Sequence, residues 1–359
     1  MKLDNNHRDM RFELLRIVSI YIIILHHLIL HVAINEYVGI NVNLLISQLY
    51  LIGGKVGVNI FLLISGYFGI KGGFRPSKAL KIELQVLFYT VLSVGIGLLF
   101  FPEIISVKII IQAILPTTFN AYWYITAYMA MYLLSPYINM VANYISRKKY
   151  IFLLGILFFI ESFAPTVLRQ RYWASDLMWF IFVYLIGAYI RNYEIGKGIK
   201  TIYLYIASAV SWLVPWIISI VLYVVSLRIV ALQKYVNVFS TSNYSFFVLA
   251  ISVLVFLTFA SMKPIYNQAI YKFSKTTLGI YLIQSNPVIA SILWQYIKNL
   301  KIHFMKLWPI YALVLSAVIL NVCYGIEKIR GQIATFVLKK NKYIQIIYKK
   351  IDSIWCGEN

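Results

Sequence analysis

Charged side chains are scarce in this sequence, and acidic ones especially so. Only 13% of the 359 residues are charged, and 12 acidic residues face 33 basic ones. So little charge excludes an ordinary soluble domain. There are two cysteines, Cys323 and Cys356, which excludes a disulfide framework and a thiol-rich metal site. A Walker loop, a dinucleotide glycine pattern and a CxxC pair are also missing, which argues against an ATP-driven pump.

What the sequence has instead is apolar residues, 61% of the total, in segments that reach bilayer length. We predict an all-α, polytopic membrane bundle of about ten spanning helices that occupies residues 1–327. The apolar segment 104–115 is short and ends at Pro116, so it is predicted to be re-entrant or interfacial. A full span there would reverse the predicted orientation of every later helix. The predicted spans are 12–33, 47–70, 80–101, 122–143, 150–168, 176–191, 201–226, 243–261, 277–297 and 307–327.

The distribution of basic residues predicts the orientation. With the N-terminus in the cytoplasm, 23 of the 33 lysines and arginines fall in cytoplasmic segments and eight in outer loops. This bias follows the positive-inside rule and puts both termini in the cytoplasm. The net charge of +21 then indicates contact with anionic membrane lipids and not with nucleic acid. The tail 328–359 is predicted to be either an amphipathic helix on the inner leaflet or a solvated basic tail.

The first predicted helix carries ionisable groups at membrane depth. Arg16 and His27 are eleven residues apart, which places them within about 20° on one helix face and about 16 Å apart along it. Such residues are functional-site candidates by default. Glu13 precedes Arg16 by one turn and can orient its guanidinium. The structural alternative is a snorkelling arginine and a hydrogen-bonded histidine, and His26 and His31 are alternative histidines.

Further polar candidates lie within the second predicted helix and in the loop directly after it. Asn59 and Ser65 lie at membrane depth and can line a cavity, whereas the glycines around them favour close helix packing. The loop after this helix has four cations between residues 71 and 81, including Arg75 and Lys78. Such a cluster either marks only the cytoplasmic side or clamps the phosphates of a donor.

Aromatic residues dominate the start of the predicted helix 122–143. Trp123 and Tyr124 suit an outer aromatic belt, while Tyr124, Tyr128 and Tyr132 form a hydroxyl stripe against which a sugar could stack. In the segment 278–287, polar residues and a proline interrupt a predicted span. They indicate either a broken helix that faces a cavity or a simple kink.

The polar and aromatic candidates lie in four stretches, which follow one another along the chain in this order: Arg16-x10-His27, GVNIFLLISGYF at 57–68, WYITAYMAMYLLSP at 123–136 and LGIYLIQSNP at 278–287. Together they resemble the acyltransferase-3 family, bacterial integral-membrane O-acyltransferases of surface polysaccharides. The resemblance covers almost the whole chain. It implies a multi-pass protein of the bacterial plasma membrane that moves an acyl group, usually acetyl, from acetyl-CoA to a hydroxyl of a lipid-linked or surface glycan, without a metal.

The resemblance also assigns roles to residues. It implies that His27 is the catalytic base and that Arg16, Arg75 and Lys78 bind acyl-CoA. The chemistry agrees, because imidazole is suited to remove a proton from a sugar hydroxyl. For the oxyanion the sequence offers Asn59, Ser65 or Tyr124 without choosing among them. The family's arginine-rich loop is reduced here, and Ile283-Gln284 replaces an Ile-His pair, so a second histidine is not available.

An alternative function is that of a polysaccharide transporter or polymerase-like membrane protein. It predicts polar residues scattered over many helices and a large outer loop. In this sequence the predicted outer loops are short, and the strongest intramembrane ionisable pair lies on one helix. The sequence does not specify the acyl group, so transfer of a succinyl or other acyl group by the same fold is also open.

Overall fold

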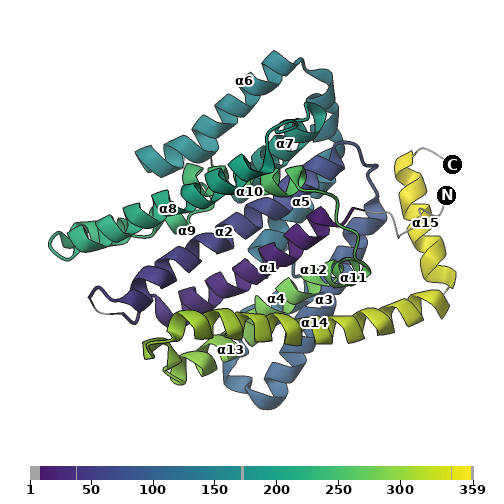
Figure 1. Ribbon diagram of the computed structural model, residues 1–359. Helices are drawn as coiled ribbons and strands as arrows, with labels where there is room; N and C mark the ends of the chain where they lie inside the picture. The colour runs from purple at the N-terminus through teal and green to yellow at the C-terminus, as the bar shows by residue number, and fades with distance from the viewer. Residues whose placement is uncertain (1–8, 38, 171–173, 341, 357–359) are drawn as a thin grey trace.

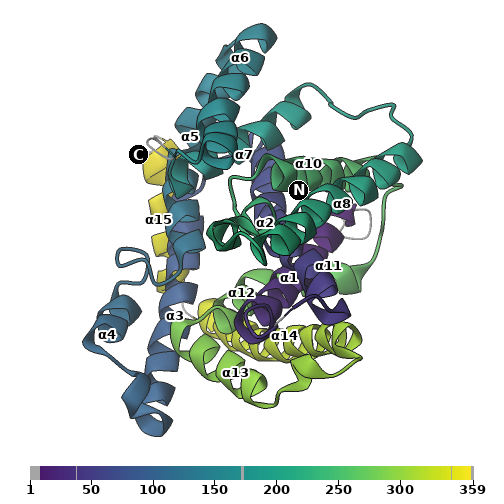
Figure 2. The same ribbon diagram turned by 90° about the vertical axis from the view of Figure 1, so that its left-hand side faces the viewer.

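A computed structural model describes residues 9–37, 39–170, 174–340 and 342–356 (Figures 1 and 2). Every regular element within these residues is a helix, which confirms the all-α prediction. Lys2, Arg8 and Arg171, which belong to the charge count, lie outside the described residues.

Among the described residues, seven helical segments are long and apolar enough to cross a bilayer. A further pair, α12 (Thr277–Gln284) and α13 (Pro287–Asn299), meets at a bend of 69° and forms either one broken span or a re-entrant loop. These segments confirm a polytopic membrane protein. The total of ten spans and the cytoplasmic termini stay predictions, since α5 (Trp123–Tyr144) and α7 (Asp176–Asn192) do not meet the same test. The seven are Arg11–Ala33 with α1 (Arg11–Leu28), α2 (Val42–Gly69), α3 (Pro76–Phe100), Arg147–Leu168 with α6 (Arg147–Phe158), α8 (Thr201–Ser226), Val230–Ser261 with α10 (Phe246–Ser261), and Trp308–Val337 within α14 (Trp308–Lys340).

The segment predicted to be re-entrant forms the short helix α4 (Val107–Ile114). Its eight residues extend about 12 Å, too little to cross a bilayer. The Thr90 hydroxyl of α3 donates to the Ala113 carbonyl (2.8 Å), and the Thr117 hydroxyl donates to the Glu83 carboxylate nearer the start of α3. The segment therefore returns alongside α3 and does not continue past it.

Helices α1 and α2 pack against each other at glycines. The His26 ring lies against Gly54, where a β-carbon would overlap it, and a β-carbon on Gly57 would lie 2.7 Å from the Ser19 carbonyl oxygen. Gly66 and Gly187 allow the same close approach between α2 and α7. The predicted role of the α2 glycines in helix packing is thus confirmed.

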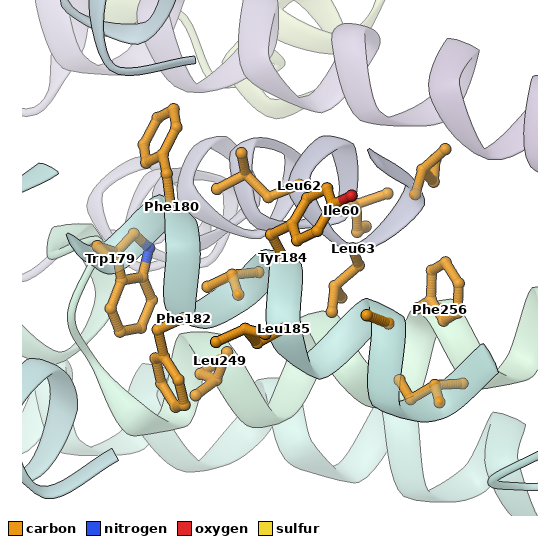
Figure 3. Close-up of a cluster of buried hydrophobic side chains, with 14 of the residues drawn as sticks. Ile60, Leu62, Leu63, Trp179, Phe180, Phe182, Tyr184, Leu185, Leu249 and Phe256 are labelled. Atoms are coloured by element: carbon orange, nitrogen blue, oxygen red, sulfur yellow. The ribbon is translucent and has the colours of Figure 1, made fainter. Parts of the chain in front are cut away.

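The main apolar core lies between α2, α7 and α10. Trp179, Phe180 and Phe182 of α7 are buried, with Ile60 and Leu63 of α2 and Leu249 and Phe256 of α10 in the same cluster (Figure 3). Large aromatic side chains contribute most to such a core because each buries a large apolar area. This core holds α2 in place. Helix α2 in turn packs against α1, the helix that carries Arg16 and His27.

The end of the chain differs from the prediction. The last spanning helix was predicted to end at residue 327, but α14 continues to Lys340. No proline interrupts residues 328–340, and exposed Ile329, Ile333 and Phe336 continue its apolar face. A second helix, α15 (Lys342–Cys356), follows and lies beside α3 (Figure 2).

Candidate active site

A cavity of about 460 Å³ opens among α1, α2, α3, α5 and α12. Phe74, Arg75 and Lys78 line it at the predicted cytoplasmic end, which we call the mouth. Tyr124 and Tyr281 line the part of the cavity that α5 and α12 enclose. Most of the described lining residues are apolar or aromatic, so cationic groups lead into a long, weakly polar space.

Arg16 enters this cavity from α1. Its guanidinium lies 3.6 Å from the buried Glu13 carboxylate, one turn earlier on the same helix. The pairing predicted from their spacing is therefore present. It holds the guanidinium in place while the Arg16 side chain stays 29% exposed, so the charge can meet a ligand inside the cavity.

His27 lies further along the same helix, half-buried. Its Nδ1 is 2.8 Å from Oε1 of Gln284, at the end of α12. The Gln284 amide Nε2 in turn donates to the Ser285 hydroxyl at 2.5 Å. This arrangement favours the tautomer with a proton on Nδ1, which leaves Nε2 able to accept one. Ile23, one turn before His27, lines the cavity, so the imidazole lies one helical turn beyond it.

The other two histidines have different surroundings. His26 is 3% exposed and its Nδ1 lies 2.6 Å from the Leu51 carbonyl oxygen of α2. His31 is exposed and stacks on Trp294, with 6.0 Å between the ring centroids. It belongs to a π-helical turn, Ile29–Ala33, that begins directly after α1. Such turns are frequent at functional sites.

The mouth brings together Arg75, Lys78 and the tyrosines of α5. The Tyr132 hydroxyl donates to the Arg75 carbonyl (3.1 Å), and the Lys78 ammonium lies 4.7 Å from the centre of the Tyr132 ring. The rings of Tyr124, Tyr128 and Tyr132 stack in sequence, 5.9 and 6.3 Å apart. The predicted tyrosine stripe is therefore confirmed, and all three rings line the cavity.

The other predicted site residues make structural contacts within the bundle. Asn59 is fully buried and its Oδ1 accepts from the Trp179 indole N–H (3.0 Å), so it belongs to the core. Ser65 lines the cavity, but its hydroxyl donates to the Phe61 carbonyl (2.8 Å). It lies about three turns along α2 from Gly54, the residue against which His26 packs. Trp123 packs against Phe180.

Two side chains without a predicted role belong to this region. Gln284 is the partner of His27, although nothing in the local pattern indicated that pairing. Lys55 lies in the middle of α2, with its ammonium 5.2 Å from the centre of the Trp123 ring. Its depth in α2, halfway along a 28-residue helix, is the signal that distinguishes it from a snorkelling lysine.

The break before Pro287 is closed by side chains. Asn286 Oδ1 accepts from the amides of Val288 (3.0 Å) and Ile289 (3.3 Å), and its Nδ2 donates to the Tyr122 hydroxyl (2.8 Å). Tyr122 donates in turn to the Leu282 carbonyl (2.8 Å). The predicted broken helix is confirmed, and its freed backbone groups are satisfied from within the bundle.

A buried carboxylate on α14 contacts α12. Glu327 of α14 accepts from Arg330 (2.7 Å) and from the Tyr89 hydroxyl (2.5 Å). The carboxylate lies against Gly279, where any β-carbon would collide with it. This network ties α14 to α3 and α12 and so sets the position of the helix that ends in Gln284.

The described residues contain no group of three or more His, Cys, Asp or Glu side chains arranged to hold a metal ion. Comparison with curated proteins and with solved structures gave no significant match. The family model of the acyltransferase-3 type, described as an acyltransferase domain, matches residues 11–327, nearly the whole chain. With its all-helical membrane fold, the chain therefore belongs to the acyltransferase-3 family and is a membrane acyltransferase.

Proposed function

We propose that this protein transfers an acetyl group from cytoplasmic acetyl-CoA to a hydroxyl of a lipid-linked or surface glycan at the bacterial plasma membrane. One observation carries the proposal: a single cavity has cations at its mouth and the His27–Gln284 pair one turn beyond its lining on α1. A donor with a charged head and a long, weakly polar arm fits that shape.

The donor binds from the mouth. Arg75 and Lys78 contact the phosphates of the nucleotide, because guanidinium and ammonium groups are the natural partners of phosphate oxygens. The pantetheine arm extends along Tyr132, Tyr128 and Tyr124, past Arg16. The thioester thereby reaches the outer part of the cavity, near His27.

His27 acts as the general base. Its Nε2 takes the proton of the sugar hydroxyl as that oxygen attacks the thioester carbonyl. The tetrahedral intermediate then collapses and expels the CoA thiolate, which receives the proton from the imidazolium. Gln284 is a positioning residue in this step, since its carboxamide oxygen holds the Nδ1–H and orients the ring.

The acceptor approaches from the outer side. The Lys55 ammonium lies 5.2 Å from the centre of the Trp123 ring, and we assign this pair to acceptor binding. Tyr124, which lines the cavity, is our candidate donor to the oxyanion, whereas Asn59 and Ser65 support the fold around the site. Glu13 keeps Arg16 oriented toward the donor.

The C-terminal segment contacts the membrane surface. Tyr343, Ile346, Ile347 and Ile354 of α15 are exposed, and Lys349 and Lys350 lie among them in the sequence. A helix with such apolar and basic residues suits the inner leaflet with its anionic lipids.

The direct test uses purified protein in lipid nanodiscs with acetyl-CoA and a glycan acceptor. Free CoA should appear only when the acceptor is present, and acetyl groups should appear on the glycan in equal amount. His27→Ala should abolish both. Intact acetyl-CoA in every reaction would overturn the proposal and favour the transporter or polymerase-like alternative.

A further inference from the structure

The helix α15 contacts the segment that carries the mouth cations. It lies beyond residue 327, where the family match ends. Figure 2 shows it alongside α3 and α5, the two helices that supply Lys78 and Tyr132. Its contacts with these helices come from Tyr348, Asp352 and Trp355, whose spacing places them on one helix face.

Asp352 caps α3. One carboxylate oxygen accepts from the Ser77 amide (2.9 Å) and the other from the Ser77 hydroxyl (2.8 Å). The residue at the N-cap position of α3 is Arg75, whose side chain has no acceptor to offer. The carboxylate therefore satisfies an otherwise open amide and complements the helix dipole. These hydrogen bonds from Ser77 hold the pKa of the Asp352 carboxyl below its usual value.

Trp355 holds the loop before α3. Its ring lies 4.9 Å from that of Phe74, edge to face, and 6.2 Å from that of Tyr137 on α5. Phe74 in turn lines the cavity and lies 5.2 Å from Tyr132. One turn into α3, the Lys81 ammonium lies 4.6 Å from the centre of the Tyr348 ring.

These contacts flank a loop that contains two glycines. Gly72 and Gly73 directly precede Phe74, and glycines leave the backbone many conformations. Phe74 and Ser77, which contact Trp355 and Asp352 of α15, lie on either side of Arg75. Lys78 directly follows Ser77. Without those contacts the two cations would keep their charge but lose their fixed direction toward the cavity.

We propose that Asp352 and Trp355 are positioning residues of the donor site, which hold Phe74, Arg75 and Lys78 at the cavity mouth. This inference rests on the proposed function, because it takes acyl-CoA as the ligand at the mouth. It extends the donor site to a helix outside the matched acyltransferase domain.

The test compares four variants of the full-length protein in nanodiscs: Asp352→Ala, Asp352→Asn, Trp355→Ala and, as the matched control, Ser353→Ala. Ser353 neighbours Asp352, and its hydroxyl donates to the Lys350 carbonyl of its own helix (2.9 Å). For Asp352→Ala and Trp355→Ala we expect the KM for acetyl-CoA to rise about tenfold, with kcat at saturating donor nearly unchanged. Asp352→Asn should be milder, since its carboxamide oxygen can still accept from the Ser77 amide.

Hydrogen exchange of residues 71–80 gives a second readout that needs no activity. The Ser77 amide should exchange faster in Asp352→Ala than in Ser353→Ala. Faster exchange with an unchanged KM would overturn the proposal, because α15 would then stabilise only the fold. A lower KM would also overturn it, as Asp352 would be competing with the donor for Arg75. A wild-type protein that leaves acetyl-CoA intact would instead refute the proposed function.

Discussion

His27 of α1 and Gln284 of α12 share a hydrogen bond, with 2.8 Å between Nδ1 and Oε1, although 257 residues separate them. The bond joins the helix that carries the predicted base to the helix that is broken at Pro287. It gives the imidazole one defined orientation, one helical turn beyond Ile23 of the cavity lining.

The first prediction concerns His27 itself. His27→Ala should lower glycan acylation by about 10²- to 10⁴-fold, the usual contribution of a general base. Binding of acetyl-CoA should be retained, because the phosphates lie at the mouth. Acetyl groups on the product glycan measure the effect at matched membrane levels. The control is His31→Ala, one turn beyond; if that variant loses activity and His27→Ala keeps it, the base is misassigned by one turn.

Gln284 should affect turnover more than donor binding. Gln284→Ala removes one hydrogen bond to the imidazole, and we expect kcat to fall about five- to tenfold with little change in the KM for acetyl-CoA. Gln284→Glu keeps an acceptor at the same place and should retain more activity. An unchanged kcat in Gln284→Ala would show that the ring is oriented by other groups.

The cations should act on donor affinity. Arg16→Ala should weaken acetyl-CoA binding about ten- to a hundredfold, and Arg75→Ala with Lys78→Ala should weaken it less. Lys197→Ala is the control for charge, since Lys197 is an exposed cation paired with Glu194. Binding to purified protein, measured by calorimetry, checks this. Equal affinity for acetyl-CoA in all variants would mean that these cations only orient the chain in the membrane.

A stability prediction follows from Gly279. Gly279→Ala drives a β-carbon into the Glu327 carboxylate, so we expect a loss of about 1–3 kcal/mol, as in other overpacked interiors. Thermal unfolding in detergent measures it. Gly325→Ala on α14 is the control, because its β-carbon meets no atom within 4 Å among the described residues. Equal unfolding temperatures for the two variants would contradict the tight contact.

Topology is the fifth prediction. Reporters fused after Lys149, Lys200 and Lys275 should read cytoplasmic, and reporters near Ala174 and Ser240 should read external, as the positive-inside rule requires. External signals at Lys149 and Lys200 would mean that the chain crosses the bilayer once more near α4.

Local pattern explains what the sequence could predict. The bounds of α8, 201–226, were predicted without error because apolar length is a property of the segment itself. The shared face of Arg16 and His27 follows from helical period, and the break at Pro287 from a residue that cannot continue the hydrogen-bond ladder. These features need no knowledge of the rest of the chain.

Partners distant in sequence could not be predicted. The composition at 283–287 indicates a polar break, but only packing shows that Gln284 meets His27 and that Asn286 meets Tyr122. The close contact of Glu327 with Gly279 and the capping of α3 at Ser77 by Asp352 are of the same kind. The sequence therefore predicts which residues lie at membrane depth, whereas the tertiary contacts decide which of them lie near the reaction.

The cap on α3 has a consequence for how the chain is made. Ser77 is synthesised 275 residues before the carboxylate that caps it. At ordinary translation rates this separation corresponds to roughly 15 to 55 s. During that time the spans that precede α14 can insert while the first turn of α3 lacks its Asp352 cap. The membrane helices before α14 are therefore in place before α3 is capped. A chain truncated before α15 would insert into the membrane without the carboxylate that accepts from the Ser77 amide and hydroxyl.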